Sequence, residues 1–296
     1  MSSVCIGVFG LQNWFAGDFA PVIELAALAE RAGIDEISIT DHVVMGEATH
    51  KYPYGKFPTA PDFAWFEPLT FLAAVAGATR HIRLGTAVVI APLRPAPLLA
   101  KQVATLDALS HGRVDLGVGV GWQEEEYAAC AVPFEARYRM LDEQMRACRL
   151  LWSEAPATFH GEFWSFERIW CKPFPVQQRI PVLHGVKLSP KSLERIAAHG
   201  DGWIPMEQEP ARIAAGAAAL RAAFRARGRS PDEVRIRAVP KFRFRADGSA
   251  DLDAALAEIP RLREAGATMI ELHAYMYCRG PQDFESFCGR LAACKR

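Results

Sequence analysis

Apolar residues along the chain alternate between two spacings, one typical of buried strands and one typical of helices. Short apolar runs, such as residues 4–11 and 36–40, are each followed by a longer segment whose apolar residues lie three and four positions apart, such as residues 18–33. About eight strand–helix units in strict alternation are typical of a (β/α)8 barrel. We therefore predict an α/β fold, a (β/α)8 TIM barrel, with residues 1–296 as one domain.

The individual elements follow from the same spacing and from helix start and stop signals, for example Asp18 as an N-cap and Gly33 as a stop. Predicted strands cover residues 4–11, 36–40, 82–91, 113–121, 180–185, 202–206, 234–244 and 269–274, and predicted helices cover residues 18–33, 66–79, 97–110, 134–152, 189–199, 210–227, 252–265 and 282–293.

Two segments interrupt the alternation. Residues 43–65 form a long connection rich in aromatic side chains, which argues against disorder and predicts a loop folded over a site. Residues 153–179 follow the fourth strand–helix unit and read as two short strands that turn at Gly161-Glu162. We expect this second segment to be a β-hairpin insertion.

The stretch 106–122 joins a helix that ends at Gly112 to an apolar strand in which every second residue is glycine, at 117, 119 and 121. Such a strand leaves room on one face, either for close packing inside the barrel or for a ligand over the strand end. A dinucleotide fingerprint is excluded, because its glycines belong in the turn that opens a helix. Asp107 and Arg113 lie where the helix joins the start of the strand, at the end of a barrel that carries stability, so we assign them structural roles.

Composition narrows the possible partners and compartments. Lys plus Arg and Asp plus Glu number 34 each, so the net charge of zero predicts no nucleic-acid or anionic-membrane partner. No basic signal region or membrane span is evident, so we expect a cytoplasmic protein. The seven cysteines contain no C-x-x-C pair, and we predict neither a disulfide framework nor a metal site.

Chemistry is expected at the carboxyl ends of the strands, because barrel active sites lie there. His42 follows the second strand beside Asp41, and a near-neutral imidazole can take up or release a proton. The other interpretation of His42 is a ring held by a loop carbonyl. Residues 184–189 lead into a helix with Ser189 as N-cap, and the free N–H groups of such a terminus favour an anion.

Several segments together carry a family resemblance. They are residues 38–42, 84–89, 94–95, 100–102, 106–113, 121–122, 161–166 and 200–203. On these motifs, within roughly residues 1–206, the chain resembles the luciferase-like monooxygenase superfamily, and within it the branch that uses the deazaflavin coenzyme F420.

The resemblance implies an enzyme that transfers a hydride between F420 and a small organic substrate. It implies that Asp41 and His42 lie against the cofactor ring. It also implies that Ala87-Val88 forms a non-prolyl cis peptide behind the ring, where the alternative is an ordinary buried strand. The remaining cofactor-binding residues that we predict lie at strand ends and in the phosphate loop: Gly119, Trp122, His184, Gly185, Val186, Lys187 and Ser189.

The chain departs from the family pattern at two places. The phosphate loop usually has a Gly-Gly pair, whereas here Gly185 is followed by Val186, and Lys187 adds a charge. Trp122 stands where sugar-phosphate dehydrogenases of the branch carry a glutamate, and an indole cannot act as that acid. We therefore expect a largely apolar substrate rather than a sugar phosphate; the candidate apolar lining is Trp14, Phe15, Trp65, Phe66 and Trp122, and Glu125 is a further acid near the site.

Two other functions remain open on the sequence alone. One is an FMN-dependent monooxygenase that receives reduced flavin from a separate reductase, and the other is a non-catalytic flavin-binding protein. We favour F420 on the branch-specific segments 161–166 and 121–122. Its acidic tail would need a basic path at the barrel mouth, which lysines could supply, although surface lysines more often serve solubility. A homodimer is expected from the resemblance; the lysines of the proposed path are Lys56, Lys172, Lys187 and Lys191.

Overall fold

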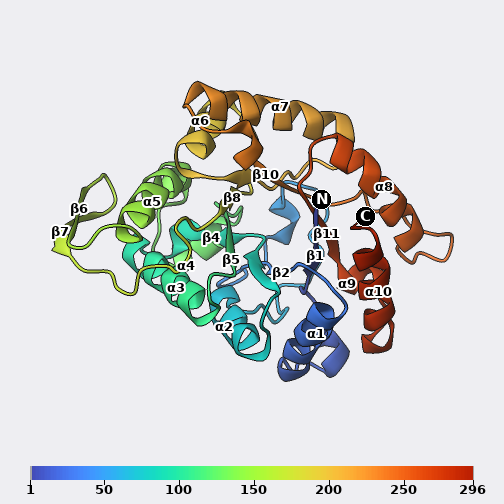
Figure 1. Cartoon of the computed structure of the whole chain (residues 1–296). Coiled ribbons are helices and arrows are strands. Elements are labelled where there is room, and N and C mark those ends of the chain that lie inside the picture. Colours follow the sequence, from blue (N-terminus) through green and yellow to red (C-terminus); the bar gives the residue numbers. More distant parts are fainter. Residues whose placement is uncertain (1, 296) are drawn as a thin grey trace.

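The computed structural model describes residues 2–295, and its centre is a closed barrel of parallel strands (Figure 1). β11 pairs with β1 and β3 pairs with β5, which closes the ring, so the predicted (β/α)8 barrel is confirmed. In barrel order the strands are β1 (Ser3–Gly7), β2 (Glu36–Ile39), β3 (Arg83–Thr86) with β4 (Val89–Ile90), β5 (Val114–Gly119), β8 (Val182–His184), β9 (Gly202–Trp203), β10 (Arg235–Ala238) and β11 (Met269–His273).

Helices surround the strands as a ring (Figure 1). Several begin at a side-chain cap; Ser189 and Asp251, for instance, each accept a hydrogen bond from the first turn that follows them. The α-helices are α1 (Ala20–Arg31), α2 (Pro68–Ala78), α3 (Ala96–Leu109), α4 (Glu124–Ala129), α5 (Arg137–Leu151), α6 (Pro190–His199), α7 (Pro210–Ala226), α8 (Leu252–Glu264), α9 (Ala274–Tyr277) and α10 (Pro281–Ala293). The 3-10 helices are Leu11–Phe15, Thr49–Lys51, Ala91–Leu93, Phe134–Ala136 and Pro231–Glu233.

The predicted insertion is present as an antiparallel hairpin, β6 (Ala157–His160) and β7 (Ser165–Ile169), which projects from the barrel (Figure 1). Its turn is held by the buried carboxylate of Glu143 on α5, which accepts bonds from the N–H groups of residues 162, 163 and 164. A Cβ on Gly161 would lie 2.1 Å from Glu143 Oε1, so the turn needs glycine to approach this carboxylate.

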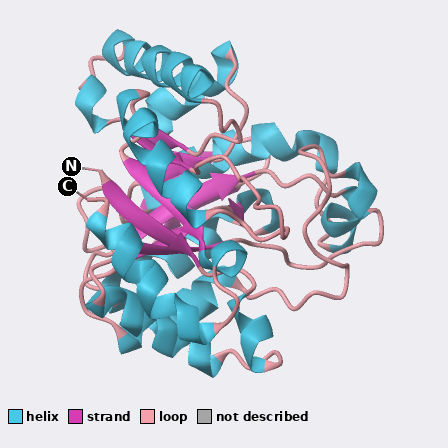
Figure 2. Cartoon of the chain, turned by 90° about the vertical axis from the view of Figure 1, so that its right-hand side faces the viewer, coloured by secondary structure: helices cyan, strands magenta, loops and turns pink. Residues whose placement is uncertain are grey.

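The two ends of the barrel differ in their connections. Both termini lie at one end, and the long loops extend from the other (Figure 2). At the first end, Asp107 accepts bonds from the N–H groups of Val176 and Gln177, and Arg113 donates to the carbonyls of Ala76 and Ile82. The structural roles predicted for Asp107 and Arg113 agree with these bonds.

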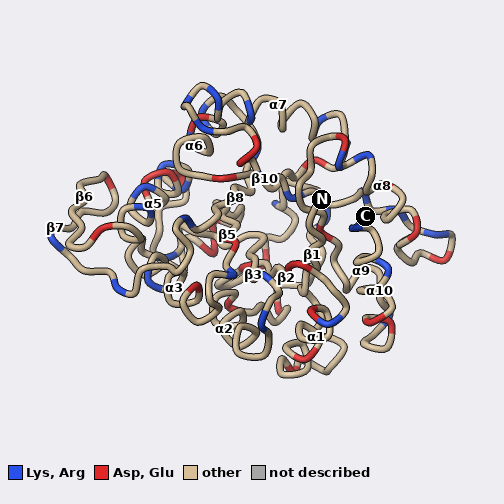
Figure 3. The backbone as a smooth tube through the Cα atoms, in the orientation of Figure 1, with Lys and Arg blue, Asp and Glu red and all other residues tan. Residues whose placement is uncertain are grey.

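Charged residues are spread along the outer helices, and a few also occur on the central strands (Figure 3). Inside the barrel, a group of them centres on Arg237, which is fully buried and forms ion pairs with Glu36 and Glu271. Burial raises the pKa of Glu36 well above its ordinary value. The sequence pattern treated these strands as apolar and did not predict this cluster.

The predicted elements differ from the structure in three main ways. The strand predicted over residues 82–91 is two strands, β3 and β4, because a cis peptide bond between Ala87 and Val88 interrupts the ladder. The strands predicted over residues 4–11 and 234–244 end earlier, at Gly7 and Ala238. Helix α4 was not predicted. No helix within residues 2–295 is both long and apolar enough to cross a membrane.

Candidate functional site

His42 lies at the loop end of the barrel and is held by a buried glutamate. Its Nδ1 is 3.0 Å from Glu126 Oε2, and the other oxygen of Glu126 accepts a 2.6 Å bond from the Val43 N–H. The His42 side chain is 8% exposed, and the Glu126 side chain is fully buried. A carboxylate on Nδ1 fixes the ring tautomer with the proton on that nitrogen, which leaves Nε2 as the nitrogen that can accept a proton.

Asp41, the second residue predicted to take part in the chemistry, is engaged elsewhere. It is buried, and Arg94 donates to both of its oxygens, over 2.6 and 3.1 Å. The Ile90 N–H also donates to Asp41, and Arg94 continues to Glu67, the N-cap of α2. Asp41 therefore links the end of β2 to the segment that follows the cis peptide, and its predicted place beside the cofactor ring stays a prediction.

The long loop of residues 43–65 brings its aromatic rings onto His42, as its composition indicated. The His42 ring lies 4.6 Å from the Trp65 ring and 5.8 Å from the Phe57 ring, measured between centroids. Trp122 joins the group from the end of β5, with its ring 5.1 Å from Phe57 and 5.3 Å from Tyr52. The wall around His42 is thus aromatic, and it contains Trp65 and Trp122 of the predicted apolar lining. Trp14, Phe15 and Phe66 instead pack against the main core, Trp14 beside Phe284 and Phe66 beside Phe71, as the alternative interpretation of these rings, ordinary core packing, predicts.

The peptide bond between Ala87 and Val88 is cis, as the resemblance implied. The partly buried Val88 packs on an apolar cluster inside the barrel that includes Leu183 and Ile204. Its two methyl groups face Gly119 and Gly185, where an added Cβ would lie 2.6 and 2.8 Å from them.

The glycine face of β5 is therefore closed by protein atoms. The Thr86 carbonyl lies beside Gly117, Val88 beside Gly119 and Ile90 beside Gly121. Of the two interpretations left open for this face, the contacts support close packing inside the barrel. The contact of Gly119 with a cofactor stays a prediction. Because Val88 covers the side of Gly119 where a side chain would lie, such a contact has to come from the Gly119 backbone.

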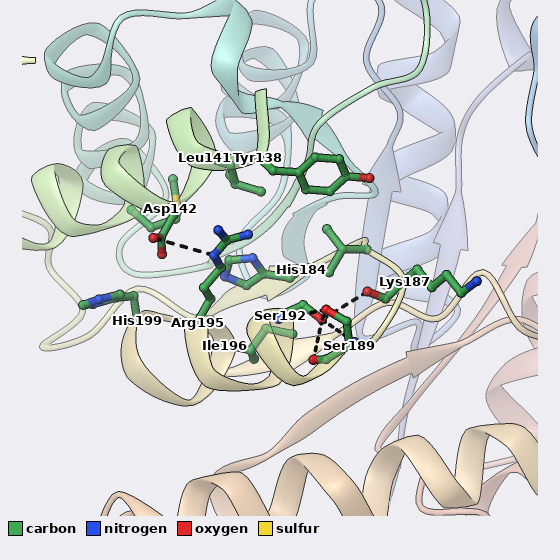
Figure 4. A pocket seen from close by; sticks show the side chains of 12 residues that line it. Tyr138, Leu141, Asp142, His184, Lys187, Ser189, Ser192, Arg195, Ile196 and His199 are labelled. Carbon is green, nitrogen blue, oxygen red and sulfur yellow. Dashed lines mark hydrogen bonds and ion pairs between the residues drawn. The ribbon is translucent and has the colours of Figure 1, made fainter. Parts of the chain in front are cut away.

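A pocket lies between α5, α6 and the end of β8 (Figure 4). It is lined by four of the predicted cofactor-binding residues, His184, Val186, Lys187 and Ser189. Arg195 also lines it and lies 3.6 Å from Asp142 across the pocket. The Lys187 ammonium makes no ion pair with any residue from 2 to 295, and its exposed side chain extends outward from the pocket (Figure 4).

The local bonds of this loop revise one expectation. The Gly185 N–H donates to the Val118 carbonyl at 2.8 Å, and the Ser189 N–H donates to Ser192 Oγ at 2.7 Å within a capping box. Neither N–H is free for a phosphate, in contrast to the prediction for Gly185. The positive charge and the start of α6 remain as the features that attract an anion.

His184 lies at the back of the pocket without charge at neutral pH. Burial, reinforced by the positive charge of Arg149, lowers the pKa of His184 to about 4. Its Nε2 is buried without a hydrogen-bond partner among the described residues, and it faces the Cα of Gly200. A neutral ring here can donate from one nitrogen and accept at the other.

Two residues of the site escaped the sequence analysis. Glu126 is in an acidic run from which Glu125 was singled out, but Glu125 contacts Lys51 at the surface, over 3.6 Å. Local spacing could not single out Glu126, because its partner His42 lies 84 residues away in the sequence. Arg94 was noted only within a family motif.

Lys172 was proposed for the basic path at the barrel mouth. In the structure it lies beside α3, where its backbone carbonyl accepts a hydrogen bond from the Lys101 ammonium, and not at the barrel mouth.

No group of three or more histidine, cysteine, aspartate or glutamate side chains within residues 2–295 is arranged to hold a metal ion.

Comparison with known proteins agrees with the motifs. A family model described as luciferase-like monooxygenase matches residues 5–286. An uncharacterized protein of Mycobacterium tuberculosis is 40% identical over 186 residues, which cover 60% of this chain and 65% of that protein. The oxygenase component of a flavin-dependent trigonelline monooxygenase from Acinetobacter baylyi is 31% identical over 181 residues, 60% of this chain and 46% of that protein. The matches thus span less than two thirds of these relatives.

Solved structures share the fold over the whole chain. The monooxygenase RslO1 from Streptomyces bottropensis superimposes with a TM-score of 0.79 at 22% identity, over 99% of this chain and 98% of that one. An F420-dependent secondary alcohol dehydrogenase in complex with an F420-acetone adduct superimposes with a TM-score of 0.77 at 16% identity, over 100% and 99% of the two chains.

Proposed function

The chain belongs to the luciferase-like monooxygenase family, and from this premise we propose that it is an oxidoreductase that transfers a hydride between the deazaflavin F420 and a small, largely apolar organic substrate. The observation that carries the proposal is the contact of His42 with the buried carboxylate of Glu126 inside an aromatic wall. This arrangement suits a residue that handles one proton in a site that excludes water.

In this proposal His42 is the catalytic residue and Glu126 positions it. Glu126 holds Nδ1, so Nε2 takes the hydroxyl proton when an alcohol is oxidised and returns it when a carbonyl is reduced. The aromatic rings of Trp65 and Trp122 orient the apolar part of the substrate. Asp41 acts through Arg94, by holding the end of β2 against the segment that follows Val88.

Features of this chain fit a ring with a phosphate-bearing side chain. Val88 presents a small apolar surface on the cis bulge, and the pocket beside α6 offers Lys187 and Arg195 to the phosphate. When bound, the deazaflavin supplies the carbon that gives or accepts the hydride. Lys56, which is exposed, and Lys187 are the cations proposed for its acidic tail. A homodimer is also part of the proposal.

A second candidate is a monooxygenase that uses reduced FMN from a separate reductase. It is supported by relatives identified from sequence, the trigonelline monooxygenase component and an FMNH2-dependent dimethylsulfone monooxygenase from Pseudomonas putida that is 35% identical over 118 residues, 39% of this chain and 32% of that protein. The Val88 surface and the phosphate pocket suit either cofactor.

Cofactor titration separates the two candidates. Fluorescence quenching of the protein is followed with F420 and with FMN at moderate salt, and oxygen uptake is measured with reduced FMN. We expect tighter binding of F420 and no oxygen uptake. Binding of FMN at least as tight as that of F420, together with oxygen uptake, would replace the first candidate with the second.

The variant His42→Ala tests the role of His42. The matched control is His160→Ala, which replaces an exposed histidine of the hairpin. We expect cofactor affinity to change by less than about tenfold and turnover to fall by about 10²–10⁴, the effect of losing an acid–base group. His160→Ala leaves both unchanged. Single-turnover absorbance changes of the cofactor measure the chemical step, and an unchanged rate in His42→Ala would refute the role.

A further inference from the structure

Three neighbouring strands bring unpaired polar atoms together on the floor of the barrel mouth. β1 lies between β2 and β11, and Gly7 is in register with Ser38 on one side and with His273 on the other. A Cβ added to Gly7 would lie 2.4 Å from His273 Nδ1. The imidazole therefore lies over the glycine and reaches toward the strand that carries Ser38.

The polar atoms at this position lack partners within the described chain. Ser38 is 1% exposed, and its Oγ, the Oγ1 of Thr40 and the Nδ1 of His273 are all buried without a hydrogen bond. Thr40 is the first residue after β2, two residues beyond Ser38, and it is on the same side if the alternation of β2 continues past Ile39. Most buried polar groups in proteins are paired, so a cluster of unpaired ones is typical of a place that another molecule completes.

The surroundings of His273 determine which of its nitrogens accepts. Its Nε2 lies 3.8 Å from Glu271 Oε1, which favours the proton on Nε2, and Glu271 is held in turn by Arg237. Phe242 stacks on the imidazole with a centroid distance of 6.3 Å. Nδ1 is therefore an acceptor in a fixed ring, while the hydroxyls of Ser38 and Thr40 can donate.

We infer that Ser38, Thr40 and His273 bind the imide edge of the cofactor ring, in which one N–H stands between two carbonyl groups. Nδ1 of His273 accepts from the imide N–H, and the two hydroxyls donate to the carbonyls. β8, which leads into the phosphate pocket, is the fifth strand of the barrel and stands opposite β1, the first. A molecule with its phosphate beside α6 and its ring over Val88 thus extends toward this floor.

The inference rests on the proposed function and adds the orientation of the ring. Its test uses two ligand pairs that differ only by a methyl group on the imide nitrogen: FMN with 3-methyl-FMN, and 8-hydroxy-5-deazariboflavin 5′-phosphate with its N3-methyl form. In the wild-type protein we expect the methyl group to weaken binding by about tenfold or more, because it removes the donor and leaves Nδ1 unpaired. Fluorescence titration measures each dissociation constant.

Variants of His273 and Ser38 test whether these residues cause the difference in affinity between the methylated and the unmethylated ligands. His273→Phe keeps a ring against Phe242 but has no acceptor, so the two members of a pair should bind within about twofold of each other. Ser38→Ala should weaken the unmethylated ligand by about three- to tenfold without a change in Tm. The exposed residues His160→Phe and Ser286→Ala are the matched controls, and they should keep the wild-type discrimination and affinity.

Each outcome supports or overturns either the proposed orientation of the ring or the proposed function. If an unmethylated ligand binds and the wild type tolerates the methyl group, the ring orientation is wrong and a water molecule is the occupant of the floor. If neither unmethylated ligand binds, the proposed function fails together with the inference. If His273→Phe does not fold, Ser38→Ala decides, since unchanged affinity in that variant overturns the inference.

Discussion

The two halves of the barrel interior differ in what surrounds their buried polar side chains. In the half near the termini, buried Arg237 forms ion pairs with Glu36 and Glu271, although Arg237 Nε and Glu36 Oε2 have no further partner in the described structure. In the half near the loops, Asp41 and His42 are paired with Arg94 and Glu126, but Ser38 Oγ and His273 Nδ1 on the floor are buried without a partner in the described structure. We call these the paired half and the unpaired half after Arg237 and Ser38; a barrel is expected to carry stability at the first end and function at the second.

The boundary between the halves is sharp, because single strands cross it. β2 carries Glu36 and then Ser38, and β11 carries Glu271 and then His273, two residues further in each case. Two residues of a strand span about 7 Å, so paired charges give way to unpaired polar atoms within one layer of side chains. Unpaired buried groups cost stability, and they are retained where binding a ligand restores the lost hydrogen bonds.

The largest expected effect breaks the paired half. Arg237→Met leaves Glu36 and Glu271 buried with no positive charge between them, so we expect a loss of about 3–5 kcal/mol in the free energy of unfolding. Urea unfolding followed by circular dichroism measures it. The control is Arg212→Met, whose side chain is 71% exposed and whose pair with Glu207 should contribute less than about 1 kcal/mol. Equal losses in the two variants would contradict the assigned role of the interior charges.

The ion pairs of the paired half were not predicted from the sequence. The alternation of strands and helices predicted the barrel, because the period of apolar residues depends on local geometry. Arg237, Glu36 and Glu271 are far apart in sequence, and only strand register brings their side chains to one layer. Short strands such as β9 were overestimated, because residues beyond the ladder are still apolar and buried, as Ile204 is.

The second prediction concerns pH and the unpaired half. The pKa of His184 is about 4 in the folded protein, against an ordinary value near 6.5. Between these values the unfolded chain binds a proton at this residue and the folded protein does not, so stability is greatest above pH 6.5 and falls as the pH is lowered toward 4. His184→Gln removes this contribution, so from pH 7 to 4.5 the wild type should lose about 2–3 kcal/mol more than the variant.

Urea unfolding at the two pH values measures that difference, and His160→Gln on the exposed hairpin is the control, which should lose as much stability as the wild type. If the wild type and His184→Gln lose the same stability, the ring is not held neutral by burial. Such a result would remove His184 from the set of unpaired groups and blur the contrast between the halves.

The site itself was predictable to the extent that it depends on position along the strands. Strand ends predicted the position of His42 at the loop end of the barrel, and Ser189 predicted the start of α6, because both follow from local sequence. Their roles in catalysis and in holding a phosphate stay predictions. Glu126 and Ser38 were missed because their importance comes from contacts between distant segments, 84 residues apart for His42 and Glu126. The glycine face of β5 was ambiguous for the same reason, since Val88, from the segment between β3 and β4, fills it.

The smallest expected effect sharpens the comparison at the edge of the unpaired half. Lys187 lines the phosphate pocket, is exposed, and makes no ion pair with the described residues, whereas Lys191, four residues on, does not line the pocket. Lys187→Ala should weaken FMN binding by about two- to fivefold, because a solvent-exposed cation contributes at most about 1 kcal/mol. The loss should shrink at high salt, since salt screens exposed charges.

Two controls accompany this prediction. Riboflavin has no phosphate, so Lys187→Ala should not change its affinity, and Lys191→Ala should leave the affinities of both ligands unchanged. An equal loss for riboflavin and FMN in Lys187→Ala would mean that this lysine supports the ring rather than the phosphate, and the anion site would have to rest on Arg195 and the start of α6 alone.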